Sequence, residues 1–290
     1  MLETETQLGN DTLVKLNEGP VTFGSGEVRL SGEVLLPNAG HRMPGAILCH
    51  GFGSSRRAVK AGAQAIASHG VAVLIFDFRG HGGSDGILDG GIVADVIDAW
   101  HFLSQFPCVD EKRIALIGHS MGAMAAILAA QQLNPRALVA LSCPPELGGK
   151  LAKATSFILD KLSNKGTTVI NELSSEGALP WPEGAINMLS RLWMHLLGFG
   201  LRVDWHSFLE VVTQAKMSTA LGKLRDCATL FVHCEGDNLS PYQSVLELYE
   251  KARHPKDLFL AKGGFHSAPL QLGGLRGGWA RWAVATLMAD

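Results

Sequence analysis

The chain has 290 residues, of which 25 are Lys or Arg and 27 are Asp or Glu, so its formal net charge is only −2. At this length, and with 47% hydrophobic residues, it can bury a large core in one sheet-based domain that carries an insertion. Because the charge is nearly balanced and no basic run exceeds Arg56-Arg57, nucleic acid is not an expected partner.

The first residues and the cysteines bear on the cellular compartment. Residues 1–6 (MLETET) are acidic and lack the apolar run of a secretory signal, and no apolar stretch predicts a membrane-spanning helix. The five cysteines are odd in number and scattered in spacing, which argues against a disulfide framework and against a zinc site. We therefore expect a cytoplasmic protein with no integral membrane segment and no metal, whose oligomeric state is unknown at this stage.

The chain opens with a polar arm, residues 1–20, and then shows a β-hairpin pattern. Its two strands are expected at 28–30 and 33–36, with Ser31-Gly32 as the turn. Beyond it, apolar runs alternate with helical patterns: strands are predicted at 45–50, 71–77, 113–118, 137–143, 228–234 and 257–261, and helices near 55–69, 92–106, 121–133, 240–252 and 275–288. This alternation predicts an α/β fold, with a mostly parallel sheet and helices on both faces.

One interval breaks the alternation. Residues 144–222 contain no predicted strand, so we expect a helical cap inserted into a core domain made of 21–143 and 223–290. Three of the six tryptophans, Trp181, Trp193 and Trp205, lie in it. Two interpretations remain for these residues: an apolar roof over the substrate, or packing of the cap onto the sheet.

The run Gly118-His119-Ser120-Met121-Gly122 joins the predicted strand 113–118 to the predicted helix 121–133. A serine in a strand-to-helix turn is forced into strained backbone geometry and displayed, and the flanking glycines permit close backbone approach. The N-terminus of the following helix points N–H groups at the position where an oxyanion would form. This context predicts that Ser120 is a nucleophile.

A serine nucleophile needs a base and an acid that orients the base. Asp237 follows the predicted strand 228–234, and His266 follows the predicted strand 257–261. If all three residues lie at the carboxyl edge of one parallel sheet, Ser120, Asp237 and His266 can form a catalytic triad. His233 lies inside an apolar strand and is interpreted as a packed, hydrogen-bonded residue.

These segments, with two further ones, resemble the α/β-hydrolase superfamily, in its esterase and monoacylglycerol-lipase-like (serine aminopeptidase-like) branch. His50-Gly51-Phe52-Gly53 is similar to the family's oxyanion loop, and residues 77–84 (DFRGHGGS) are similar to its D-x-R-G-x-G-x-S turn. The resemblance implies backbone oxyanion donors at Phe52 and Met121, a loop-organising role for His50, and His119 beside the nucleophile in the substrate pocket. It also implies that Asp237 is the acid rather than Asp204 or Glu210, which precede the seventh strand.

The expected function is that of a carboxylesterase acting on short- to medium-chain acyl esters through an acyl-enzyme. Its substrate is a small-molecule ester, and no cofactor is required. Two alternatives stay open within the same branch: a serine peptidase of the aminopeptidase type, for which Glu172, Glu176 and Glu183 could hold a substrate amine, and a monoacylglycerol lipase. A binding protein on an inactive hydrolase scaffold is disfavoured by the intact Ser, Asp and His set.

Overall fold

The computed structural model describes residues 16–38, 40–146, 167–169 and 201–289. Eight strands form one sheet in the order β1-β2-β4-β3-β5-β6-β9-β10. The strands are β1 (Leu16–Ser25), β2 (Val28–Pro37), β3 (Met43–Cys49), β4 (Ala72–Phe76), β5 (Val109–His119), β6 (Ala137–Leu141), β9 (Ala228–Cys234) and β10 (Lys256–Ala261). From β4 to β10 all neighbours are parallel, whereas β1 and β2 are antiparallel additions at one edge. The α/β prediction and all six predicted strands are confirmed.

The predicted hairpin turn at Ser31-Gly32 is wrong. Both residues lie inside β2, which pairs with β1 along its length, and the turn falls at Gly26-Glu27 instead. Gly32 is required by close approach rather than by a turn, because a Cβ there would lie 2.9 Å from the carbonyl oxygen of Ile75 on β4. β1 also begins at Leu16, inside the segment assigned to the arm.

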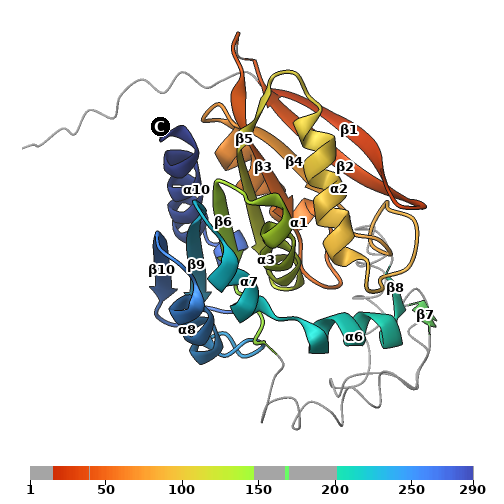
Figure 1. The fold of residues 1–290 in the computed structure, drawn as a ribbon, viewed down its shortest axis with the longest axis vertical. Coiled ribbons are helices and arrows are strands. Elements are labelled where there is room, and N and C mark those ends of the chain that lie inside the picture. Colours follow the sequence, from red (N-terminus) through yellow and green to blue (C-terminus); the bar gives the residue numbers. More distant parts are fainter. Residues whose placement is uncertain (1–15, 39, 147–166, 170–200, 290) are drawn as a thin grey trace, which may run out of the picture.

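Helices cover both faces of the sheet (Figure 1). They are α1 (Arg56–Ala67), α2 (Ile92–Ser104), α3 (Met121–Leu133), α6 (Trp205–Gln214), α7 (Met217–Lys223), α8 (Tyr242–Lys251), α9 (Ala268–Gln271) and α10 (Gly273–Met288). On one face, α1 and α10 pack around the fully buried Trp279. On the other face, α2, α3, α7 and α8 contribute to a second and larger cluster.

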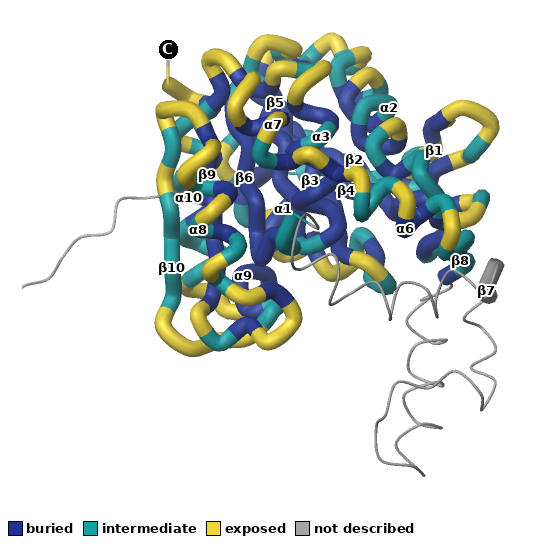
Figure 2. Tube along the Cα trace, turned by 60° about the horizontal axis from the view of Figure 1, so that its bottom comes forward, coloured by how far each residue is buried: buried dark blue, intermediate teal, exposed yellow. Residues whose placement is uncertain are grey.

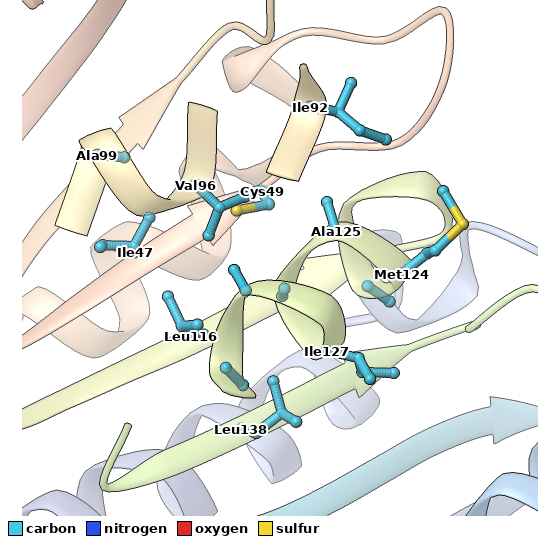
Figure 3. Packing of buried hydrophobic residues seen from close by; sticks show 14 of the residues in the cluster. Ile47, Cys49, Ile92, Val96, Ala99, Leu116, Met124, Ala125, Ile127 and Leu138 are labelled. Carbon is cyan, nitrogen blue, oxygen red and sulfur yellow. The ribbon is translucent and has the colours of Figure 1, made fainter. Parts of the chain in front are cut away.

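The inner parallel strands β3, β4, β6 and β9 are buried on both faces, so they are continuous apolar runs rather than alternating ones, whereas the edge strand β10 is only half-buried (Figure 2). Successive residues of β3 belong alternately to the two clusters. Ile47 and Cys49 point to the side of α2 and α3, and Leu48 points to the side of α1. Figure 3 shows Ile47 and Cys49 meeting Val96 of α2 and Ala125 of α3. Small residues on α3 let this helix lie close to the sheet directly after the predicted nucleophile.

Part of the expected cap, residues 144–222, lies within the described residues. A short antiparallel pair, β7 (Thr167–Val169) with β8 (Arg202–Asp204), precedes α6 and α7. α7 packs on α3 through Met217, Ala220 and Leu221, whereas α6 lies at the lower margin of the sheet in Figure 1. Trp181 and Trp193, together with the three glutamates 172, 176 and 183, lie outside the described residues. No helix in the described part of the chain is long and apolar enough to cross a membrane.

Candidate active site

Ser120 occupies the junction of β5 and α3 with φ 54° and ψ −119°. A positive φ is costly for a residue with a Cβ, and it persists only where the surroundings enforce it. Here the Ser120 N–H donates to the carbonyl of Leu141 on β6 at 2.9 Å, and its carbonyl accepts from the N–H of Ala123 at 2.9 Å. The turn therefore holds the Ser120 side chain clear of both the strand and the helix.

The two glycines of the turn are required by contact with backbone. A Cβ at Gly118 would collide with the backbone of Gly122, and a Cβ at Gly122 would lie 2.5 Å from the carbonyl oxygens of both Cys49 and His50. α3 can cross the end of β3 only because neither position has a side chain. The glycine pattern of the sequence thus corresponds to a physical constraint.

Asp237 and His266 meet through a hydrogen bond of 2.8 Å between His266 Nδ1 and Asp237 Oδ2. A carboxylate only accepts, so this bond assigns the proton of His266 to Nδ1 and leaves Nε2 with a lone pair. The other carboxylate oxygen of Asp237 accepts from the N–H groups of Leu239 at 2.9 Å and Ser240 at 3.0 Å. The Asp237 side chain is completely buried, and these donors replace water around it.

Ser120 and His266 line a common cavity of about 380 Å³. The other lining residues are Gly51, Phe52, Ser54, Ala58, His119, Ser267, Leu270 and Gln271. His119 links the two predicted catalytic loops, because its Nε2 donates to the carbonyl of His266 at 3.0 Å. Burial lowers the pKa of His119 to about 4, so the ring is neutral near pH 7. The structure thus brings Ser120, His119, Asp237 and His266 together at the carboxyl edge of the sheet.

Two buried histidines hold the loop that follows β3. His50 Nε2 accepts the N–H of Phe78 at 3.1 Å while its Nδ1 donates to the carbonyl of Gly51 at 2.7 Å. In the same way His81 Nε2 accepts the N–H of Gly53 at 3.1 Å, and its Nδ1 donates to the carbonyl of Arg79. Both bonding patterns require neutral rings, and burial lowers the pKa of His50 to about 4 and that of His81 to about 3.

The loop presents Phe52 beside the turn at Ser120. A Cβ at Gly51 would lie 3.0 Å from Nδ1 of His119 and 3.3 Å from Cβ of Ser120, so the two segments are in close approach. Within the described residues, neither the N–H of Phe52 nor that of Met121 has a hydrogen-bond acceptor. Met121 is the first residue of α3, where N–H groups have no partner inside the helix. These two groups are available to an oxyanion.

The segment 77–84 braces this arrangement. Oδ1 of Asp77 accepts the N–H of Arg56 at the start of α1 at 2.6 Å, which caps that helix and places a carboxylate at the positive end of its dipole. The guanidinium of Arg79 donates twice to Asp95 of α2, at 3.0 and 2.7 Å. Sequence reasoning missed Asp95, although an acidic residue in the first turn of a largely apolar helix was a usable signal.

Three other residues considered in the sequence analysis, His233, Asp204 and Trp205, do not line the cavity. His233 is fully buried, and its Nε2 donates to the carbonyl of Ser240 at 2.8 Å, as the packed interpretation predicts. Asp204 caps the N-terminus of α6 by accepting from His206 and Ser207. Trp205 packs on Phe52 and is not one of the residues that line the cavity. Among the described residues, no group of His, Cys, Asp and Glu is arranged to hold a metal ion.

The fold and the site together define an α/β-hydrolase. The chain belongs to the hydrolase family described as serine aminopeptidase, S33, and the match spans residues 45–270. The structure is similar to the α/β-hydrolase GrgF from Penicillium sp. sh18, with a TM-score of 0.72 and 22% identity over 94% of this chain and 98% of that one. It is also similar to Est1E from Butyrivibrio proteoclasticus with bound ferulic acid, with a TM-score of 0.67 and 18% identity over 93% of this chain and 100% of that one.

Two curated proteins are similar to this chain over different lengths. Uncharacterized protein Rv2307c of Mycobacterium tuberculosis (strain ATCC 25618 / H37Rv) is 35% identical over 132 residues, which cover 45% of this chain and 44% of that protein. The chain therefore aligns with less than half the length of this relative. Acyltransferase drtE of Aspergillus calidoustus is 26% identical over 263 residues, which cover 82% of this chain and 84% of that protein.

Proposed function

We propose that the protein is a carboxylic ester hydrolase that uses Ser120 as nucleophile, His266 as general base and Asp237 as the acid that orients it. One observation carries the proposal: His266, whose Nδ1 is hydrogen-bonded to Asp237, lines the same cavity as the strained Ser120. This combination serves acyl transfer, because a hydroxyl becomes nucleophilic only beside an oriented base.

In the proposed reaction, His266 Nε2 removes the proton of Ser120 as Oγ attacks the ester carbonyl carbon. The tetrahedral oxyanion receives hydrogen bonds from the N–H groups of Phe52 and Met121, which strengthen as negative charge develops on the oxygen. The tetrahedral intermediate then collapses and expels the alcohol, which takes its proton from His266. Water attacks the acyl-enzyme by the same route and releases the carboxylic acid.

The proposed substrates are small esters with short to medium acyl chains. The cavity volume lies toward the lower end of the range usual for small-molecule sites, and Phe52, Ala58 and Leu270 give it apolar walls. The similarity to acyltransferase drtE supports acyl-transfer chemistry for the site. A monoacylglycerol lipase remains a narrower version of the same proposal, distinguished by the alcohol it releases.

The second candidate function is that of an aminopeptidase, which the family's description favours. A peptidase of that type must hold the protonated amine of its substrate, and a carboxylate is the group suited to this. Among the described residues that line the cavity, none is Asp or Glu. This lining favours an uncharged ester over a peptide with a free amine.

A direct comparison of substrates tests the proposal. The purified protein is assayed with p-nitrophenyl acetate, butyrate and hexanoate and with p-nitroanilides of leucine, alanine and proline. We expect kcat/KM for the best ester to exceed that for every anilide by at least about 100-fold, because none of the described residues that line the cavity carries a carboxylate for the amine. Faster cleavage of an aminoacyl anilide than of all esters would replace the esterase proposal with the peptidase one.

A further inference from the structure

The ring of Phe52 contacts a helix of the inserted segment. Its centroid lies 5.5 Å from that of Phe208, with the two planes 28° apart, and 5.7 Å from the ring of Trp205, with the planes 36° apart. Both partners belong to α6, on successive turns of the same side. Phe52 is still 40% exposed, whereas Phe208 is only 7% exposed. Phe208 is therefore the buried ring of the pair, and the more exposed ring of Phe52 stacks on it.

α6 is itself fixed to the same part of the core. The strand before it, β8, bonds to the 80–88 loop: the N–H of Arg202 donates to Gly80 at 2.9 Å, and the N–H of Leu88 donates to Arg202 at 2.7 Å. That loop contains His81, which accepts the N–H of Gly53 directly after Phe52. The oxyanion loop therefore has two supports, a hydrogen bond from Gly53 to His81 and ring contacts between Phe52 and α6.

We propose that Phe208 is a positioning residue for the oxyanion loop, so that the inserted segment takes part in catalysis through the backbone N–H of Phe52. The inference rests on the proposed function, in which that N–H stabilises the oxyanion. Phe208 is not among the residues that line the cavity, so it does not touch the reacting atoms. It acts by stacking on the Phe52 ring and so limiting the positions that the Phe52 backbone adopts.

The position of the Phe52 N–H matters because hydrogen bonding to an oxyanion depends steeply on distance. An oxyanion donor is effective only within about 2.7–3.1 Å of the developing charge. A displacement of about 1 Å can cost on the order of 100-fold in rate. Without the ring of Phe208, the Phe52 ring loses its stacked partner and, among the described residues, keeps only its tilted contact with Trp205 and its edge contact with His81. The Gly53 bond to His81 holds only the next residue of the loop.

The test compares two buried positions of one helix. Phe208→Ala removes the stacked ring, and Leu209→Ala removes a neighbouring side chain of similar burial, 8% exposed, that is not part of the aromatic cluster. We expect Phe208→Ala to lower kcat for the best ester by about 10- to 100-fold with KM within about twofold. Leu209→Ala should keep kcat within about threefold, and Phe208→Tyr, which retains the ring, should do the same.

Binding of inhibitors separates a positioning role from a loss of structure. An alkylboronic acid that bonds to the nucleophile forms a tetrahedral adduct with an oxygen at the oxyanion position, whereas the matching primary amide remains an unreacted ground-state analogue. For Phe208→Ala the inhibition constant of the boronic acid should rise about 10- to 100-fold, in parallel with the loss of kcat. The inhibition constant of the amide should change less than about twofold. If Phe208→Ala does not fold, Phe208→Leu is measured in its place.

Two results would overturn the inference. One is a kcat of Phe208→Ala, or of Phe208→Leu if the first does not fold, that equals that of Leu209→Ala. The other is an equal weakening of the boronic acid and the amide, which shows a general disturbance of the cavity. Failure of the proposed function is distinguishable, because in that case the wild-type protein and Leu209→Ala also hydrolyse no ester.

Discussion

The carboxylate of Asp237 is held by N–H donors on both of its oxygens. Oδ1 accepts from Leu239 and Ser240, and Oδ2 faces His266 Nδ1 at 2.8 Å, with Nε2 of His233 at 3.5 Å. Charged acceptors in a buried site are strongly stabilised by such bonds. The arrangement therefore fixes both the orientation of the Asp237 side chain and the protonated nitrogen of His266.

We predict that Asp237→Asn folds but loses about 10⁴-fold in kcat. The amide oxygen must face the N–H groups of Leu239 and Ser240, so the amide NH₂ faces His266 and donates to Nδ1. The proton of His266 then moves to Nε2, which can no longer act as base. Steady-state kinetics with a p-nitrophenyl ester and a thermal melt measure the two quantities. Retention of more than a tenth of wild-type kcat would show that another carboxylate is the acid.

The histidines of the oxyanion loop make stability depend on pH. The pKa of His50 is about 4 in the folded protein because of burial, against 6.5 for a free histidine. Between these values the unfolded chain binds a proton that the folded chain does not, so the free energy of unfolding falls as pH falls. From pH 7 to pH 5 the loss from His50 alone is about 2 kcal/mol.

We predict that His50→Gln shows a flatter dependence of stability on pH. Its free energy of unfolding at pH 7 is lower than that of the wild type, since the bonds to Phe78 and Gly51 change. The drop from pH 7 to pH 5, however, should be about 2 kcal/mol smaller than in the wild type. Urea unfolding at the two pH values measures this difference. Equal drops in the two proteins would mean that His50 is not held neutral by the fold.

At the scale of elements, the turn between β5 and α3 depends on backbone contact. We predict that Gly122→Ala lowers the free energy of unfolding by at least about 2 kcal/mol and reduces activity, since its Cβ would press on the carbonyls of Cys49 and His50. Gly222→Ala in α7 is the matched control, because a Cβ there meets nothing closer than the carbonyl of Lys251 at 3.8 Å. It should raise stability by about 0.5–1 kcal/mol.

Urea unfolding of both glycine variants decides the matter. A Gly122→Ala protein as stable as Gly222→Ala would contradict the close approach of α3 to β3.

The elements were predictable from sequence where burial on both faces produced a continuous apolar run, as in β3, β4 and β9. The turn prediction at Ser31-Gly32 is wrong because Ser-Gly is also found inside a strand where the glycine lies against a neighbouring strand. The sequence alone does not distinguish the two cases. The sequence predicts α6 only as an unspecified part of a helical cap, and its contact with Phe52 not at all. Phe208 meets that ring only in three dimensions, about 150 residues further along the chain.

For the whole molecule, the parallel sheet explains how distant segments meet. The loops after β3, β5, β9 and β10 emerge at one edge, so Phe52, Ser120, Asp237 and His266 converge although 214 residues separate the first from the last. Chain order and turn context select Ser120, Asp237 and His266 as candidates, and the resemblance to the oxyanion loop adds Phe52. The walls of the cavity were not predictable, because Ser267, Leu270 and Gln271 follow the last parallel strand without a pattern that marks them.

We predict that kcat/KM rises about fourfold per methylene along acetyl, butyryl and hexanoyl esters until the cavity is full. Each buried CH₂ contributes about 0.8 kcal/mol, and Leu270 closes part of the apolar wall. Leu270→Ala should therefore move the optimum to longer chains. Trp205→Ala, outside the lining, should lower the rate without moving the optimum. The opposite outcome for these two variants would place the acyl chain against α6 instead.

Covalent labelling shows directly whether Ser120 is the nucleophile. Wild-type protein is treated with a fluorophosphonate, and its intact mass and peptide map are measured beside those of Ser120→Ala. We predict one adduct per wild-type chain, located at Ser120, and none on the variant, whose esterase activity falls by roughly 10⁴- to 10⁶-fold with the fold intact. An adduct at another residue, or a Ser120→Ala protein with more than a tenth of wild-type activity, would contradict the account.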